Sequence, residues 1–197
     1  MQIESANKEQ THEILSQIKK RWSPREFDPA KNISPSQISL LFEAARWAPS
    51  SYNNQSWRFI YAKRDTPSWK TLFNLLVPFN QDWAKNASVL IVAFSKTTFD
   101  HNGKPARTHA FDTGAAWENL ALQGVSMGLV VHGMEGFDYE KAKKDLKIPD
   151  DYEVHAMIVV GKPGKKEDLP PALQERETPS DRKPITQFIF EGTFGGR

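Results

Sequence analysis

The chain has 197 residues and a formal net charge of +2, with 26 Lys and Arg against 24 Asp and Glu. This length suits a single domain over residues 1–197 with a substantial core, and 39% apolar residues exclude a disordered or fibrous chain. The near balance of charges argues against nucleic acid as a main partner, and the absence of cysteine excludes disulfides, zinc–thiolate sites and thiol nucleophiles.

The N-terminal segment, residues 1–21, is too polar for a signal peptide. No apolar run approaches the roughly 20 residues needed to cross a bilayer. The absence of cysteine also fits a reducing compartment. We therefore expect a cytoplasmic protein with no membrane partner.

Helical and strand-like segments mix along the chain. Apolar spacing predicts helices over 8–20, 34–47, 68–77, 80–86, 106–127 and 138–146, and apolar runs predict strands over 57–63, 88–95, 129–133 and 153–160. Ser34, followed by Pro35, and Asp138 are predicted helix N-caps. The order lacks a regular βαβ rhythm, so we predict an α+β fold with a mixed central sheet flanked by helices.

The longest predicted helix carries a stripe of mostly small residues at steps of three and four: Gly114, Trp117, Ala121, Gly124 and Gly128. Such a stripe lets another helix approach closely. After a polar stretch over 162–184, read as a surface loop, the chain ends in the aromatic tail ITQFIFEGTFGG (185–196). We expect this tail to pack on the body of the chain or on a partner subunit.

Several chemical signatures are missing from the sequence. It has no GxGxxG after a strand, no Walker spacing in GKPGKK (161–166), no HExxH and no GxSxG. The five histidines are scattered, and we predict no metal site.

Two polar stretches remain to be explained. RWSPREF (21–27) holds Arg21 and Arg25 around a proline, and arginine presents a planar fork of donors suited to phosphate. The alternative is a solvated pair of surface arginines. APSSYNNQSW (48–57) offers more hydroxyl and amide groups than a helix cap requires, which suits a flat heteroaromatic ligand, although a capping loop is the alternative.

Five motifs in this order resemble those of the FMN-dependent nitroreductase family. RWSPREF resembles R-R-S-x-R-x-F, and APSSYNNQSW resembles A-P-S-S-x-N-x-Q-P-W. Asn80 precedes a predicted strand as in that family, FDTGAAWENLALQGVSMGLVVHGMEGFD (111–138) resembles its central helix, strand and turn, and DRKPI (181–185) resembles its late basic motif. The resemblance spans about residues 14–188. It departs at Ser56, where proline is usual, and at Trp22, where a basic or polar residue is commoner.

The resemblance implies an intertwined homodimer with FMN at the subunit interface and the C-terminal arm on the partner. Within residues 21–27, called the early loop below, the implied cofactor-binding residues are Arg21, Trp22, Ser23 and Arg25. Pro49, Ser50, Ser51 and Asn53, with Gln55 a weaker candidate, would reach over from the other subunit. Asn80 would bond the polar edge of the flavin, Glu135 and Gly136 would lie near its central ring, and Arg182 and Lys183 would approach its phosphate.

The implied activity is that of an NAD(P)H-dependent flavin oxidoreductase. NAD(P)H would deliver hydride to flavin N5 and leave, and a nitroaromatic, a quinone or a similar flat electrophile would then take its place in ping-pong turnover. The sequence assigns no catalytic side chain and does not separate NADH from NADPH. The alternatives are the same fold with dehalogenation or flavin cleavage, a non-catalytic FMN-binding protein, and an α+β dimer without flavin.

Aromatic residues of 65–83 and of the loop 97–109 are candidates to roof the pocket and stack on substrate. Core packing is the favoured alternative for each. These residues are Trp69, Phe73, Phe79, Trp83 and Phe99.

Overall fold

The computed structural model describes residues 13–196. The predicted helix over 8–20 is represented there by α1 (Ser16–Lys20), and its earlier residues lie outside the described range. The remaining predicted helices and strands are all present.

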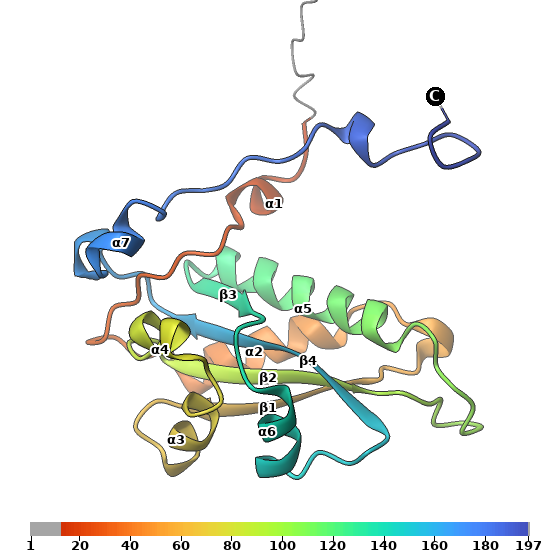
Figure 1. Cartoon of the computed structure of the whole chain (residues 1–197), viewed down its shortest axis with the longest axis horizontal. Coiled ribbons are helices and arrows are strands. Elements are labelled where there is room, and N and C mark those ends of the chain that lie inside the picture. The colour runs from red at the N-terminus through yellow and green to blue at the C-terminus, as the bar shows by residue number, and fades with distance from the viewer. Residues whose placement is uncertain (1–12, 197) are drawn as a thin grey trace, which may run out of the picture.

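A four-stranded sheet forms the centre of the molecule (Figure 1). Its strands are β1 (Trp57–Lys63), β2 (Val89–Lys96), β3 (Val130–Met134) and β4 (Tyr152–Gly161), in the order β1-β2-β4-β3. Every neighbouring pair is antiparallel, so the predicted mixed sheet is wrong. The helical connection between β2 and β3 suggests parallel neighbours, but β4 enters between them and pairs with both.

Helices cover both faces of the sheet. One face carries α2 (Pro35–Arg46) and α5 (His109–Ser126), and the other carries α3 (Pro67–Phe73), α4 (Pro78–Ala84) and α6 (Tyr139–Asp145). Side chains of β2 alternate between the two cores: Val89, Ile91 and Ala93 pack with α2 and α5, and Leu90, Val92 and Phe94 pack with the other helices. The central strand is therefore buried on both sides, which explains its continuous apolar sequence.

The predicted helix starts are confirmed. Ser34 Oγ accepts a hydrogen bond from the Gln37 backbone N–H at 3.2 Å, and Gln37 Oε1 accepts one from the Ser34 N–H at 3.0 Å. Asp138 Oδ1 caps α6 by accepting from the Lys141 N–H at 2.9 Å. Both caps satisfy backbone donors that a helix leaves free at its first turn.

A β-bulge interrupts the pairing of β2 with β4. Ala93 lies opposite Ala156 and Phe94 lies opposite Val154, so His155 is an extra residue in β4. Val154 packs with the α3–α4–α6 core, whereas His155 and Ala156 both line a cavity on the α5 side of the sheet. Strict alternation from Met157 would place His155 on the α3–α4–α6 side, and the bulge places it on the α5 side instead.

Part of the small-residue stripe of α5 packs inside its own subunit, and the rest is partly or fully exposed. Ala121 and Gly124 are buried, and a Cβ on Gly124 would overlap the Val131 side chain of β3. Gly128 has φ +65° and follows the helix as a left-handed terminator. Gly114 is exposed, with no atom within 4 Å of a Cβ built there.

The stretch 162–184 is partly folded onto the body, in contrast to the predicted surface loop. It contains the 3₁₀-helix η2 (Lys166–Asp168) and α7 (Pro171–Gln174), with Leu169 and Leu173 buried. Beyond it, the tail with η3 (Ile185–Gln187) runs away from the rest of the chain (Figure 1). Its aromatic side chains are exposed.

Glu177 connects the late segment, residues 162–184, to the early loop by binding Arg25. Its carboxylate accepts hydrogen bonds from the Arg25 backbone N–H and, at 3.4 Å, from Arg25 Nη1. Burial, together with a hydrogen bond to Glu177, raises the pKa of the adjacent Glu26 from its ordinary 4.5 to about 7. Burial opposes the ionisation of Glu177, but the bonds from Glu26 and Arg25 outweigh it and lower its pKa. Glu26 therefore holds the proton that the two carboxyl groups share.

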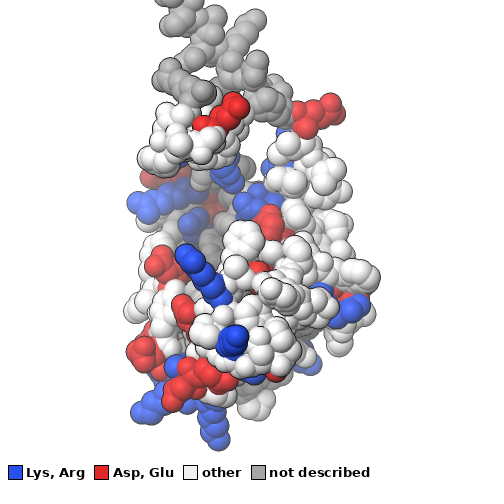
Figure 2. Space-filling model, turned by 90° about the vertical axis from the view of Figure 1, so that its right-hand side faces the viewer, with Lys and Arg blue, Asp and Glu red and all other residues white. Residues whose placement is uncertain are grey.

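Charges of both signs are interspersed over the face seen in Figure 2. Lys and Arg side chains there lie beside Asp and Glu, without one broad basic patch. No helix within residues 13–196 combines the length and apolar character required to span a membrane.

The two helical glycines predict opposite effects of one substitution. Gly124→Ala should lower the free energy of unfolding by about 1–3 kcal/mol, because the added methyl group forces Val131 to move in a packed core. Gly114→Ala should raise it by up to about 1 kcal/mol, because the site is open and alanine favours helix. Urea unfolding measures both, and a Gly124→Ala variant as stable as Gly114→Ala would contradict this packing.

The shared proton predicts a pH-dependent stability. Because folding raises the pKa of Glu26, protonated Glu26 stabilises the folded state. This contribution to the free energy of unfolding is complete below about pH 4.5 and is lost as pH rises through about 7. The wild-type protein should lose on the order of 1 kcal/mol of unfolding free energy between pH 5 and pH 8, a size limited by solvent screening. Glu26→Gln keeps a donor toward Glu177 and should abolish this loss.

Glu43→Gln is the matched control for this measurement. Hydrogen bonds from Arg46 and Trp47 lower the pKa of Glu43 to about 2, well below the tested window. Its variant should keep the wild-type slope of unfolding free energy against pH. If Glu26→Gln keeps that slope as well, the assignment of the proton is wrong.

Candidate functional site

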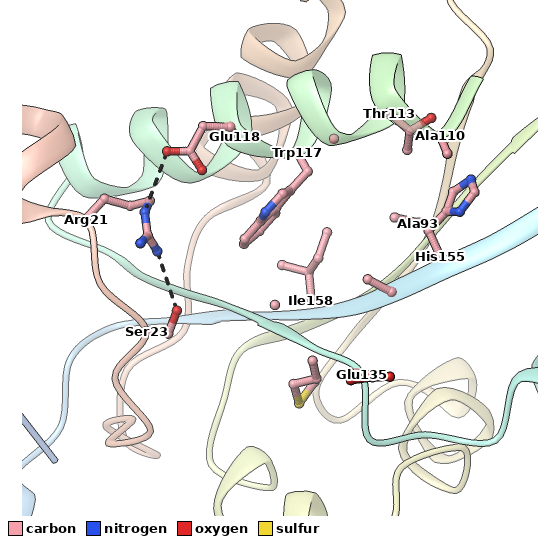
Figure 3. A pocket seen from close by; sticks show the side chains of 14 residues that line it. Arg21, Ser23, Ala93, Ala110, Thr113, Trp117, Glu118, Glu135, His155 and Ile158 are labelled. Carbon is pink, nitrogen blue, oxygen red and sulfur yellow. Dashed lines mark hydrogen bonds and ion pairs between the residues drawn. The ribbon is translucent and has the colours of Figure 1, made fainter. Parts of the chain in front are cut away.

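A cavity of about 500 Å³ lies between α5, the sheet and the early loop (Figure 3). Its volume falls in the range of small-molecule and cofactor sites. The lining residues are Arg21, Ser23, Ala93, Ala110, Thr113, Gly114, Trp117, Glu118, Gly133, Met134, Glu135, His155, Ala156 and Ile158. Of the predicted cofactor-binding residues, the structure brings Arg21, Ser23 and Glu135 together here.

One end of the cavity is polar and holds Arg21 beside Glu118. Arg21 Nη1 donates to Ser23 Oγ at 3.5 Å, and Arg21 Nε lies 3.6 Å from Glu118 Oε1 on α5. The ion pair is partly open to water and is therefore weak. The guanidinium is held at the cavity while its remaining donors stay available to an anion.

The middle of the cavity is apolar. The indole of Trp117 projects from α5 toward Ile158 of β4 in Figure 3. Gly133 lies beneath the indole, and a Cβ there would come within 3.1 Å of the ring. The absence of a side chain at Gly133 thus lets the indole lie close to the strand and leaves a flat apolar wall.

Asn80 shapes the turn that carries Glu135. Asn80 Nδ2 donates to the Gly136 carbonyl oxygen at 3.0 Å, and the same oxygen accepts from the Val77 N–H at 3.1 Å. A Cβ on Gly136 would lie 2.6 Å from Asn80 Nδ2, so this bond needs glycine. Asn80 and Gly136 are thus neighbours, and they fix the backbone beside Glu135 at the cavity wall.

The loop after α2 is not part of the cavity wall among the described residues. It contains Pro49, Ser50, Ser51 and Asn53, which the resemblance assigns to the other subunit. The loop is held on α5, where the Ser51 N–H donates to Asp112 Oδ2 at 3.0 Å. It also carries three residues with φ near +50°, namely Tyr52, Asn53 and Gln55, so its conformation is strained and specific.

The other predicted phosphate ligands lie outside the cavity lining. Arg25 is paired with Glu177, and Trp22 is half-buried within the early loop. Arg182 and Lys183 are exposed, and Arg182 Nη1 donates to the Ser180 carbonyl oxygen at 2.7 Å.

A hydrogen-bonded network of two histidines borders the cavity, and sequence reasoning missed it. His155 Nε2 lies 2.6 Å from Ser95 Oγ, which lies 2.8 Å from His109 Nδ1. His109 Nε2 lies 3.5 Å from Glu153 Oε2. Burial lowers the pKa of His155. Ser95, His109 and the pair of Glu153 and His155 come from three separate segments of the chain, so no single local motif could reveal the group.

The predicted substrate-stacking residues mostly belong to the core. Trp83 is buried, and its ring centroid lies 6.2 Å from that of Phe27 and 4.7 Å from that of His132. Trp69 and Phe73 stack on each other and pack on the same core. Phe99 meets Tyr52 edge to face, and Phe79 is exposed. None of the five is among the described residues that line the cavity.

No group of three or more His, Asp or Glu in residues 13–196 is arranged to hold a metal ion. The cavity therefore has an end with an arginine, a flat apolar middle and a histidine border. This donor set suits a flat ring system that carries a negative group.

Comparison with known proteins agrees with this geometry. The Nitroreductase family model matches residues 18–72 and 64–162. Protein DrgA of Synechocystis sp. (strain ATCC 27184 / PCC 6803 / Kazusa) is 31% identical over 182 residues, which cover 78% of this chain and 84% of DrgA. The Major NAD(P)H-flavin oxidoreductase of Aliivibrio fischeri is 31% identical over 91 residues, 45% of this chain and 42% of that protein.

A solved structure described as an oxidoreductase containing FMN superimposes with a TM-score of 0.89. It is 42% identical in sequence, and the match covers 94% of this chain and 95% of that chain. The predicted α+β fold and the family suggested by the motifs are both confirmed. The chain belongs to the nitroreductase family.

Proposed function

We propose that the protein is an FMN-dependent oxidoreductase that uses NAD(P)H to reduce flat electrophiles such as nitroaromatics or quinones. The observation that most strongly supports this proposal is the cavity, with the Arg21 guanidinium at one end and an apolar wall of Trp117 and Ile158 along its middle. The names of the relatives and the FMN of the similar solved structure support the same enzyme class.

The residues of the cavity fit FMN by their chemistry. Arg21 and Ser23 would bind the phosphate through charge-assisted hydrogen bonds. The Trp117 wall would exclude water from one side of the ring, and the Asn80–Gly136 bond would hold the Glu135 turn in position beside it. Bound FMN would supply the hydride acceptor and electron carrier that the side chains lack.

The remaining predicted contacts rest on the resemblance. Trp22, Arg25, Arg182 and Lys183 are proposed to lie around the phosphate, and Pro49, Ser50, Ser51 and Asn53 to come from a second subunit. Arg25 would have to exchange part of its pairing with Glu177 for the phosphate.

We further propose an intertwined homodimer with the C-terminal arm on the partner subunit. Large apolar side chains are exposed on α5 and just after α2, with Phe111 81% and Trp47 73% exposed, and Phe194 of the tail is 94% exposed. Such apolar area normally meets another surface.

Purified protein should be yellow and should lose its visible absorbance when NADH or NADPH is added without oxygen. A quinone added next should restore the absorbance, as expected for ping-pong turnover. Protein that binds FMN without reacting with either nucleotide would support the non-catalytic alternative. Protein that stays colourless with added FMN would contradict the proposal.

Arg21→Ala tests the phosphate end of the site in the same protein. It should weaken FMN binding by about 1.5–3 kcal/mol, because a charged hydrogen bond to phosphate is lost. Arg46→Ala is the matched control, because Arg46 pairs with Glu43 on the surface of α2, and this variant should bind FMN normally. Fluorescence titration of FMN measures both affinities.

A chain that ends at residue 184 tests the proposed arm. Light scattering should give twice the mass of one chain for the full protein and a larger monomer fraction for the shortened one. A shortened chain that dimerises as tightly as the full protein would rule out a role of the tail in the interface.

A further inference from the structure

The network of His155, Ser95, His109 and Glu153 links the cavity to the surface through three polar contacts. Ser95 is fully buried on β2, Glu153 is exposed on β4, and His155 borders the cavity (Figure 3). The β-bulge at His155 is what turns its ring to the same side as Ser95.

The hydrogen positions in this network follow from its donors and acceptors. A serine hydroxyl has one hydrogen, so Ser95 donates to one imidazole and must accept from the other. The Glu153 carboxylate favours a hydrogen on His109 Nε2, so His109 Nδ1 accepts from Ser95. Ser95 then accepts from His155 Nε2–H, and His155 Nδ1 is left as the basic nitrogen available to the cavity.

When His155 Nδ1 takes up one proton, the direction of both hydrogen bonds to Ser95 reverses, and the positive charge does not stay on His155. The Nε2 hydrogen of His155 passes to Ser95, and the Ser95 hydrogen passes to His109 Nδ1. His109 becomes the imidazolium and faces the Glu153 carboxylate. Burial disfavours a charge on His155 itself, which favours this distribution.

The neighbouring side chains bond the backbone of the two histidines and not their rings, so they do not interrupt the network as a path for protons. Tyr139 of α6 donates to the backbone carbonyl oxygen of His155 at 3.3 Å, not to its ring. Thr113 donates to the His109 carbonyl oxygen at 2.7 Å. The other carboxylates on the cavity are Glu135, on the turn after β3, and Glu118, which pairs with Arg21.

We propose that His155 is the acid that protonates the reduced electron acceptor, and that Ser95 and His109 are positioning residues that hold the accompanying charge beside Glu153. This inference rests on the proposed function, since transfer of a hydride to a quinone leaves an anion that needs one proton. The N–H bond at His155 Nδ1 breaks, its proton joins the anionic oxygen, and the hydrogens of Ser95 and His109 return to the first arrangement. Water in the open cavity supplies the next proton.

Imidazole ¹⁵N NMR of the purified protein tests the network independently of turnover. His155 should be protonated at Nε2 at high pH, and a change in its protonation should shift the ring ¹⁵N signals of His109. Ser95→Ala should uncouple the two rings. Ser88→Ala is the matched control, because Ser88 is a buried serine immediately before the same strand, and its hydroxyl donates to the Lys31 carbonyl oxygen at 3.2 Å. This variant should leave both rings unchanged. A His155 ring protonated at Nδ1, or ring ¹⁵N signals unaffected by Ser95→Ala, would overturn the arrangement.

Stopped-flow kinetics of the FMN-loaded protein tests the acid role, with His155→Gln and with menadione as acceptor. Reduction by NAD(P)H needs no proton from His155 and should keep its wild-type rate. Reoxidation by menadione should slow on the order of 100-fold and lose its solvent deuterium isotope effect. Normal reduction combined with wild-type reoxidation in His155→Gln would overturn the inference alone. Wild-type protein that NAD(P)H cannot reduce would overturn the proposed function and this role with it.

Discussion

The insertion of β4 between β2 and β3 is the constraint on which the rest of the structure depends. β4 exchanges backbone hydrogen bonds with both neighbours, although it is the last strand of the four in sequence. Without it, β3 would have no partner in the sheet, and α5 would have no continuous surface to cover. The two cores, one on each face of the sheet, both include residues of β4. The fold is therefore complete only when its most distant segment has docked.

The cavity is a consequence of how closely α5 approaches this sheet. Gly124 lets the helix contact Val131 near its C-terminal end, and Gly133 lets the Trp117 ring lie over β3. Toward its N-terminal end, His109, Ala110, Thr113 and Gly114 border the network or the cavity. One helix thus seals the core at one end and leaves room for a ligand at the other.

The early loop reaches the cavity because the late segment holds it there. Glu177 binds Arg25 through both the backbone and the guanidinium, so that Arg21, four residues earlier, lies at the cavity end. The pKa of Glu26 is raised and that of Glu177 is lowered, so one proton between them suffices at neutral pH. The position of Arg21 at the cavity and the protonation of Glu26 are therefore connected through a short stretch of chain.

The identity and order of the helices and strands, the caps at Ser34 and Asp138, and the family can all be predicted from the sequence. These depend on local apolar period, on side chains that bond the nearest backbone and on motifs a few residues long. The tertiary structure alone decided that the sheet is antiparallel, because the strand that fills the gap between β2 and β3 comes after both. It also decided that Ala121 and Gly124 serve the subunit's own packing and that Trp83 lies in the core. Only the folded chain brings His155, Ser95, His109 and Glu153 together, because a one-residue bulge and pairing between distant strands leave no mark on any short stretch of sequence.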